Sequence, residues 1–139
     1  MLFRSQSAVR EHDVVGRWGG EGFLVMAPKA RGDALDALAK RLLAVVSDTP
    51  VALANGRTLT VTVSIGYGAF PLPPCEQPID WERALNLADM ALYTAKSQGR
   101  HRAIGVAALA DHETALADAE EDFERAWSDG LVQLHVEAA

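Results

Sequence analysis

Two consecutive glycines, Gly19 and Gly20, separate two short apolar segments and constrain the N-terminal part of this chain more than any other feature. The segment before them contains the β-branched residues 14–15, and the apolar segment 23–27 after them ends at Pro28. Glycine accepts positive φ angles and leaves no side chain over a turn, so the pair favours a tight β-hairpin. Most glycine hairpins are only turns, although bare backbone can also approach a ligand closely. The stretch therefore predicts a hairpin, and as a second possibility a binding loop.

The length and composition suit one globular domain. The 139 residues are 49% hydrophobic, which is enough for a substantial core. No apolar run approaches the roughly 20 residues of a membrane span, and no signal-peptide pattern opens the chain. The single Cys75 cannot form an internal disulfide, which favours a reducing, cytoplasmic setting. The four histidines are scattered without metal-ligand spacing, so we expect no zinc site.

The charge is unevenly distributed along the chain. Residues 1–110 carry 12 Lys or Arg and 10 Asp or Glu, whereas 111–129 carry eight acidic residues and one Arg. The acidic segment therefore stands apart from the rest. No basic stripe is present that would neutralise a phosphate backbone, so nucleic acid polymers are not expected as partners. A few local arginines can still bind a small phosphorylated ligand.

Hydrophobic periodicity predicts the order of the elements. We expect a helix end within 1–13, the hairpin through Ala27, a helix over 33–47, strands over 51–54 and 58–70, a helix over 81–97, a strand over 101–106, a helix over 111–127 and a terminal strand over 131–136. Asp80 is expected to cap the helix over 81–97. The predicted buried stripe of that helix consists of Ala84, Leu85, Ala88, Leu92 and Ala95. Trp81 and Trp127 are expected to anchor the core.

Three separated motifs resemble one protein family. The segment Arg17-Trp18-Gly19-Gly20-Glu21-Gly22-Phe23 resembles the motif that names the GGDEF family, the diguanylate cyclase domains of bacterial cyclic di-GMP signalling. Residues 61–66 resemble a strand of that family, and 88–100 resemble its last helix. The resemblance covers about 1–106 and implies an α/β (α+β) fold with a ferredoxin-like, nucleotide-cyclase-type central sheet and flanking helices.

The resemblance also implies a chemistry and shows where this chain departs from it. A diguanylate cyclase dimer joins two GTP molecules, with Mg²⁺ held by carboxylates at the third and fourth motif positions and on the first strand of the domain. Glu21 fills the third position and is the remaining candidate metal ligand. Gly22 stands at the fourth position and has no side chain. The family's first strand and its guanine-recognising helix also have no counterpart, so we expect this chain alone to be no cyclase.

Two further groups of residues match binding positions of the family. Gly19, Gly20, Lys96 and Arg100 match positions that contact the GTP phosphates. Lys96 and Arg100 lie one helical turn apart, and the alternative is that they only favour the helix dipole at a solvated last turn. Arg10, Asp13 and Arg41 match the family's inhibitory site for cyclic di-GMP. The alternative there is an ordinary surface pair with a solvated arginine.

The C-terminal part raises a separate question. Residues 123–136 weakly resemble the opening of an EAL phosphodiesterase domain, which often follows a GGDEF domain. We therefore divide the chain into a truncated GGDEF domain, 1–106, and an acidic helix plus strand, 107–139. The extra strand could repair the sheet within the chain, exchange between two chains, or belong to a following domain.

These observations lead to one expected function and two alternatives. We expect a degenerate, cytoplasmic GGDEF domain that binds cyclic di-GMP or another protein and that forms a homodimer or contacts a partner signalling domain. The first alternative is a diguanylate cyclase completed by sequence missing here, which would bind GTP and Mg²⁺. The second is a relic scaffold that binds no nucleotide.

Overall fold

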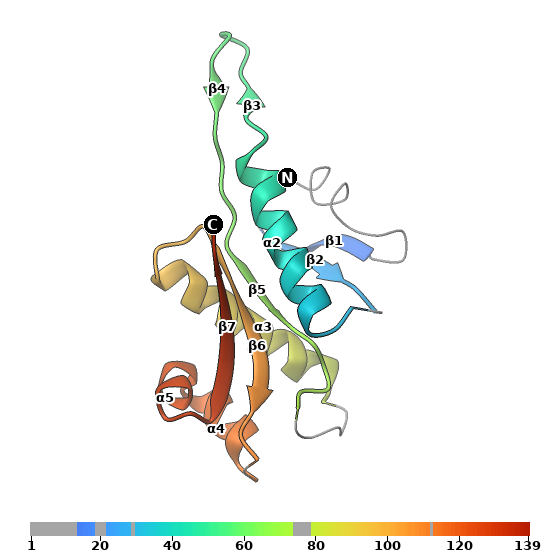
Figure 1. Cartoon of the computed structure of the whole chain (residues 1–139), viewed down its shortest axis with the longest axis vertical. Helices are drawn as coiled ribbons and strands as arrows, with labels where there is room; N and C mark the ends of the chain where they lie inside the picture. The colour runs from blue at the N-terminus through green and yellow to red at the C-terminus, as the bar shows by residue number, and fades with distance from the viewer. Residues whose placement is uncertain (1–13, 19–21, 29, 74–78, 112) are drawn as a thin grey trace.

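A computed structural model of the chain describes residues 14–18, 22–28, 30–73, 79–111 and 113–139. The described elements run in the order β1 (Val14–Trp18), β2 (Gly22–Met26), α2 (Asp33–Ser47), β3 (Val51–Ala52), β4 (Thr58–Leu59), β5 (Ile65–Gly68), α3 (Trp81–Ser97), β6 (Arg102–Leu109), α4 (Ala115–Glu121), α5 (Phe123–Ser128) and β7 (Val132–Ala138) (Figure 1). The fold is mixed α+β, as predicted. The helix end expected within 1–13 lies outside the described residues.

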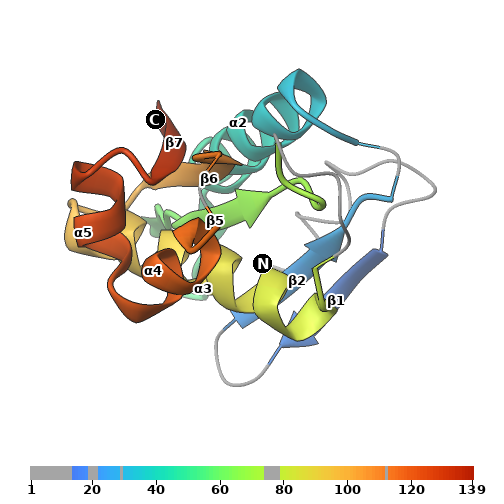
Figure 2. The same ribbon diagram turned by 90° about the horizontal axis from the view of Figure 1, so that it is seen from below.

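The main sheet has three strands in the order β5-β6-β7. Strand β5 pairs with β6 in parallel, and β6 pairs with β7 in antiparallel orientation. Helix α2 covers one face of this sheet, while α3, α4 and α5 cover the other (Figure 2). The alternation of side chains along β6 explains the two layers, because Ala103 faces α2 whereas Ile104 and Val106 face α3.

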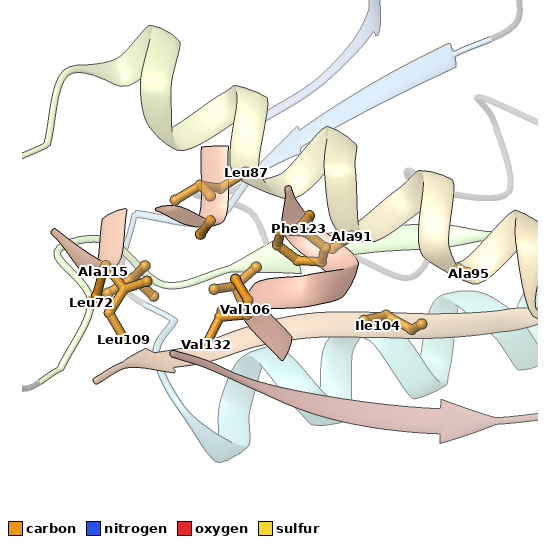
Figure 3. Close-up of a cluster of buried hydrophobic side chains, with 12 residues drawn as sticks. Leu72, Leu87, Ala91, Ala95, Ile104, Val106, Leu109, Ala115, Phe123 and Val132 are labelled. Atoms are coloured by element: carbon orange, nitrogen blue, oxygen red, sulfur yellow. The ribbon is translucent and has the colours of Figure 1, made fainter. Parts of the chain in front are cut away.

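The larger core lies between the sheet and α3, α4 and α5 (Figure 3). Its fully buried members include Leu87 and Ala91 of α3, Ile104 of β6 and Val132 of β7. A smaller cluster joins α2 to the hairpin, where Val25 and Ala27 pack against Leu38 and Leu42 together with Ile65 of β5. The hairpin is thus held to the body through the side chains of α2.

Among the described residues, the hairpin and the main sheet share no backbone pairing. Strands β1 and β2 form one two-stranded antiparallel sheet, and β3 and β4 form another that projects from the body. Strand β7 lies beyond β6, on the side away from β5. The terminal strand therefore extends the main sheet at its outer edge and does not lie between the hairpin and β5.

Two glycines set how closely elements approach. A Cβ placed on Gly66 would lie 2.0 Å from the carbonyl oxygen of Ala88 and 2.3 Å from the backbone nitrogen of Leu92, so only glycine lets α3 lie this close to β5. A Cβ on Gly105 would lie 2.4 Å from the Tyr67 ring, which crosses β6 at this point.

Several sequence predictions need correction. The strand expected over 58–70 is divided, with only β4 and β5 paired. The helix expected over 111–127 is broken at Asp122, whose backbone is extended and whose side chain accepts a hydrogen bond from the backbone N–H of Arg125 to cap α5. Trp81 was expected in the core, but its side chain is 67% exposed.

The buried stripe of α3 was also placed incorrectly. Ala84 and Ala95 are buried as predicted, but the other buried positions are Leu87, Ala91 and Thr94. The reason is that α3 packs on two sides: its backbone at Ala88 and Leu92 approaches β5, while the neighbouring side chains enter the core shared with α4 and α5. Asp80 is the N-cap residue, but its side chain makes no capping hydrogen bond.

Candidate functional site

The glycine motif lies where strand β1 passes into β2. Trp18 and Gly22 are the last cross-strand pair of the hairpin, and the three residues between them complete the motif. Gly19, Gly20 and Glu21 lie outside the described residues. Gly22 opens β2 and is exposed, so the position is accessible but carries no functional group. A glycine here can contribute only backbone to a site.

The described residues do not offer a set of ligands that fits Mg²⁺. Within 14–18, 22–28, 30–73, 79–111 and 113–139, no group of three or more His, Cys, Asp or Glu side chains is arranged to hold a metal ion. Magnesium takes oxygen ligands, mostly carboxylates. Gly22 supplies none, and Glu21 lies outside the described part of the chain.

A second part of the candidate site is the C-terminal end of α3. Lys96 and Arg100 are exposed there, as expected for residues that contact phosphates. The chain leaves the helix through two non-glycine residues with positive φ, Arg100 at 64° and His101 at 48°. The Arg102 side chain donates through Nε to the carbonyl oxygen of Arg100 at 3.0 Å. The result is a cluster of cations at a helix C-terminus, which the helix dipole also stabilises.

Sequence reasoning did not single out the environment of His101. Its Nε2 is buried and has no hydrogen-bond partner among the described residues. An unsatisfied buried nitrogen and two consecutive left-handed residues both cost free energy, and such features gather at functional sites. The available signal was its position after Gly99 and Arg100, where a residue that tolerates left-handed backbone, such as Asn, is the ordinary choice.

The candidate inhibitory site is described only in part. Arg10 and Asp13 lie outside the described residues. Arg41 lies on α2 and is exposed. Because α2 and α3 cover opposite faces of the main sheet, the structure does not bring Arg41 together with Lys96 and Arg100 (Figure 2). The two predicted groups therefore belong to separate surfaces.

No helix in the described part of the chain combines the length and apolar character needed to cross a membrane.

Comparison with known proteins gives consistent matches to one family. A family model for "Diguanylate cyclase, GGDEF domain" matches residues 4–102. The diguanylate cyclase DosC of Escherichia coli (strain K12) is 36% identical over 94 residues, which cover 68% of this chain and 19% of that protein. The solved structure of the diguanylate cyclase SiaD in complex with its activator SiaC, from Pseudomonas aeruginosa, is similar with a TM-score of 0.63 and 31% identity, covering 74% of this chain and 37% of that one.

One similarity extends into the C-terminal segment. The cyclic di-GMP phosphodiesterase NbdA of Pseudomonas aeruginosa is 32% identical over 133 residues, which cover 95% of this chain and 16% of that protein. A match of this extent necessarily includes α4 and α5. The chain spans about a quarter or less of the length of the curated relatives it matches.

Proposed function

Because the chain belongs to the GGDEF family of diguanylate cyclase domains, which act in cyclic di-GMP signalling, we propose that it is a degenerate, non-catalytic member that binds cyclic di-GMP or a partner protein. The observation that carries this proposal is Gly22, an exposed strand residue at the fourth motif position. The family generally uses Mg²⁺, and glycine cannot replace a carboxylate that binds it. The motif here retains one carboxylate, Glu21.

Loss of a carboxylate from such a site has a large effect on the rate. The attacking hydroxyl must lose its proton while metal ions screen a highly anionic triphosphate, and carboxylates support both tasks. Removing one member of a catalytic group usually lowers the rate by orders of magnitude. We therefore expect the purified chain to form cyclic di-GMP at least about 100-fold more slowly than an active family member.

Cyclic di-GMP binding is supported by residue types. Arg10 and Asp13 precede the hairpin by the family spacing, and Arg41 stands exposed on α2. Arginine presents a planar set of donors that matches a phosphate or a guanine edge, and aspartate accepts from guanine N–H groups. This set is independent of Gly22, so ligand binding can persist without catalysis. Lys96 at the end of α3 and Arg100 just beyond it would add a phosphate contact, for GTP.

The binding proposal is tested by calorimetry with cyclic di-GMP. We expect the wild-type chain to bind, and Arg41→Ala and Arg10→Ala to weaken binding by about 10- to 100-fold, because a charge-assisted hydrogen bond is lost. Arg57→Ala is the matched control, since Arg57 is an exposed arginine on the β3–β4 hairpin, away from α2. If the wild-type chain does not bind cyclic di-GMP, the result favours the alternative of a scaffold without nucleotide binding.

The enzyme alternative is supported by the small share of its relatives that the chain covers and by strand edges without a partner. It spans 19% of DosC, and β2 and β5 each have an edge with no partner strand among the described residues. A preceding segment could supply a strand and further carboxylates. Turnover of GTP with Mg²⁺ by the purified chain would contradict the non-catalytic proposal and favour an enzyme, and Gly22→Glu should then raise the rate.

We further propose that the C-terminal segment, 107–139, leads into a following domain, since the NbdA match extends into this segment. SiaD in complex with its activator SiaC is a precedent for a family member that contacts another protein. Whether the chain forms a homodimer can be measured by light scattering, which gives the molar mass in solution. The single cysteine supports a cytoplasmic setting for this binding activity.

A further inference from the structure

Four polar side chains from three elements meet on the face of the main sheet that α2 covers. The Tyr67 hydroxyl of β5 donates to Asp36 Oδ1 of α2 at 2.6 Å. His135 Nε2 of β7 lies 2.9 Å from Glu137 Oε1 and 4.0 Å from Asp36 Oδ2. The side chains of Asp36 and Glu137 are 27% and 26% exposed. We call these four residues the polar cluster.

The sheet register places the cluster in one row. Tyr67 pairs with Gly105, and Gly105 pairs with His135, so the three residues lie side by side across β5, β6 and β7. The middle position has no side chain, and a Cβ there would lie 2.8 Å from the Tyr67 hydroxyl oxygen. The Tyr67 ring therefore crosses β6 over Gly105 and reaches α2 beside the terminal strand.

The hydrogen-bond roles follow from chemistry. An ionised carboxylate only accepts, so His135 Nε2 carries the proton that it shares with Glu137. Tyr67 donates to Asp36, and burial, this hydrogen bond and the charges of Asp36 and Glu137 raise the pKa of Tyr67. The cluster is thus a connected set in which Asp36 of α2 stands between a donor from β5 and an imidazole from β7.

We propose that the polar cluster is a clasp that couples the docking of β7 to the position of α2. The helix contacts β7, and Asp36 is the helix residue that accepts from Tyr67 and lies 4.0 Å from His135 of β7. When β7 leaves the sheet, Asp36 loses the neighbouring imidazole and the Tyr67 hydroxyl becomes open to water. Detachment of β7 therefore loosens α2, and displacement of α2 weakens the hold on β7. This linkage joins the C-terminal segment to the family-matched part and does not depend on nucleotide binding.

Hydrogen exchange of the full chain tests the coupling. We expect Tyr67→Phe, which keeps the ring and removes the hydroxyl, to accelerate exchange of amides in both α2 and β7 by about tenfold, the usual effect of one lost hydrogen bond to a charged group. His135→Ala should accelerate exchange in α2 as well as in β7. Gln133→Ala is the control, because Gln133 is an exposed residue of the same strand outside the cluster.

Faster exchange in both α2 and β7 for Tyr67→Phe and for His135→Ala supports the clasp, provided that Gln133→Ala leaves exchange in both elements unchanged. Faster exchange confined to the element that carries the substitution, or unchanged exchange in α2 for His135→Ala, would overturn it. A Tyr67→Phe/His135→Ala double variant adds a second readout. If the two residues are coupled, the double variant should accelerate amide exchange by clearly less than the product of the two single accelerations.

Discussion

Replacing Gly66 with alanine should strongly destabilise the fold, because the added methyl group meets backbone. Its Cβ would lie 2.0 Å from the Ala88 carbonyl oxygen, whereas ordinary contact begins near 3.4 Å. Helix α3 must therefore move away from β5 by about 1.4 Å. No side-chain rotation relieves this clash, since the nearest atoms all belong to the helix backbone.

The cost can be estimated from what the helix buries. A gap of 0.5–1 Å already forfeits roughly a quarter to a half of the dispersion energy at a contact. Leu87 of α3 and Ile104 of β6 are both fully buried, and burial of each contributes about 1.5–3 kcal/mol. Losing about half of this combined burial energy, with strain of about 1–3 kcal/mol from overpacking, gives about 2.5–6 kcal/mol in total. For a domain of this size, the midpoint of thermal unfolding should fall by roughly 10–20 °C.

Thermal and urea unfolding followed by circular dichroism would measure the change. Gly16→Ala is the matched control, because a Cβ at Gly16 has nothing within 4 Å, and its free energy of unfolding should stay within about 0.5 kcal/mol of wild type. A Gly66→Ala variant as stable as the Gly16→Ala variant would refute the close packing of α3 on β5.

Three further predictions concern other parts of the chain. The raised pKa of Tyr67 means that the folded state keeps a proton that the unfolded chain releases near pH 10. The resulting stability is complete below that pH and is lost as the pH rises above it. Urea unfolding between pH 9 and about 11.5 should therefore show a steeper loss for wild type than for Tyr67→Phe, by up to about 1.4 kcal/mol per pH unit, and parallel curves would contradict this. Asp122→Ala should cost about 1 kcal/mol in urea unfolding through loss of the α5 cap, while Glu121→Ala beside it should be nearly neutral. Trp81→Ala should change the free energy of unfolding by less than about 0.5 kcal/mol, because the side chain is exposed. A larger loss of stability would indicate that Trp81 packs in the core, as the sequence predicted.

Local signals predicted the two long helices to the residue. Helices α2 and α3 begin and end where the sequence placed them, because each combines an apolar stripe with clear limits, Pro50 after the first and Asp80 before the second. The order of motifs also predicted the α+β fold. These features depend on neighbours within a few residues of each other, which is the information that a sequence pattern contains.

Features that depend on distant partners were not predictable in the same way. The alternation over 58–70 is typical of a strand, but pairing requires a neighbouring strand, and between β4 and β5 the structure assigns none. In the sequence, Asp122 cannot be told apart from the other acidic residues of 111–127. Only the structure shows that its side chain accepts from the backbone N–H of Arg125 and so caps a new helix. The meeting of Tyr67, Asp36 and His135 depends on three segments that are far apart in the chain.

The candidate site was predicted by residue type and by resemblance more than by geometry. Lys96, Arg100 and Arg41 are exposed, as binding residues must be. Their separation on two faces of the sheet follows from the layer order, which no spacing along the sequence contains. The buried Nε2 of His101 is likewise a product of packing. Gly22 is the exception, since the absence of a carboxylate is visible in the sequence itself.

The composition of the larger core has a consequence for how the chain folds. This core consists of twelve buried side chains, and all of them fall between Leu72 and Val132. Chains shortened at residue 102, where the family match ends, would lose eight of these buried side chains: Ile104, Val106, Leu109, Ala115, Ala119, Phe123, Ala126 and Val132. A fragment cut at the edge of the family match should therefore not fold at all.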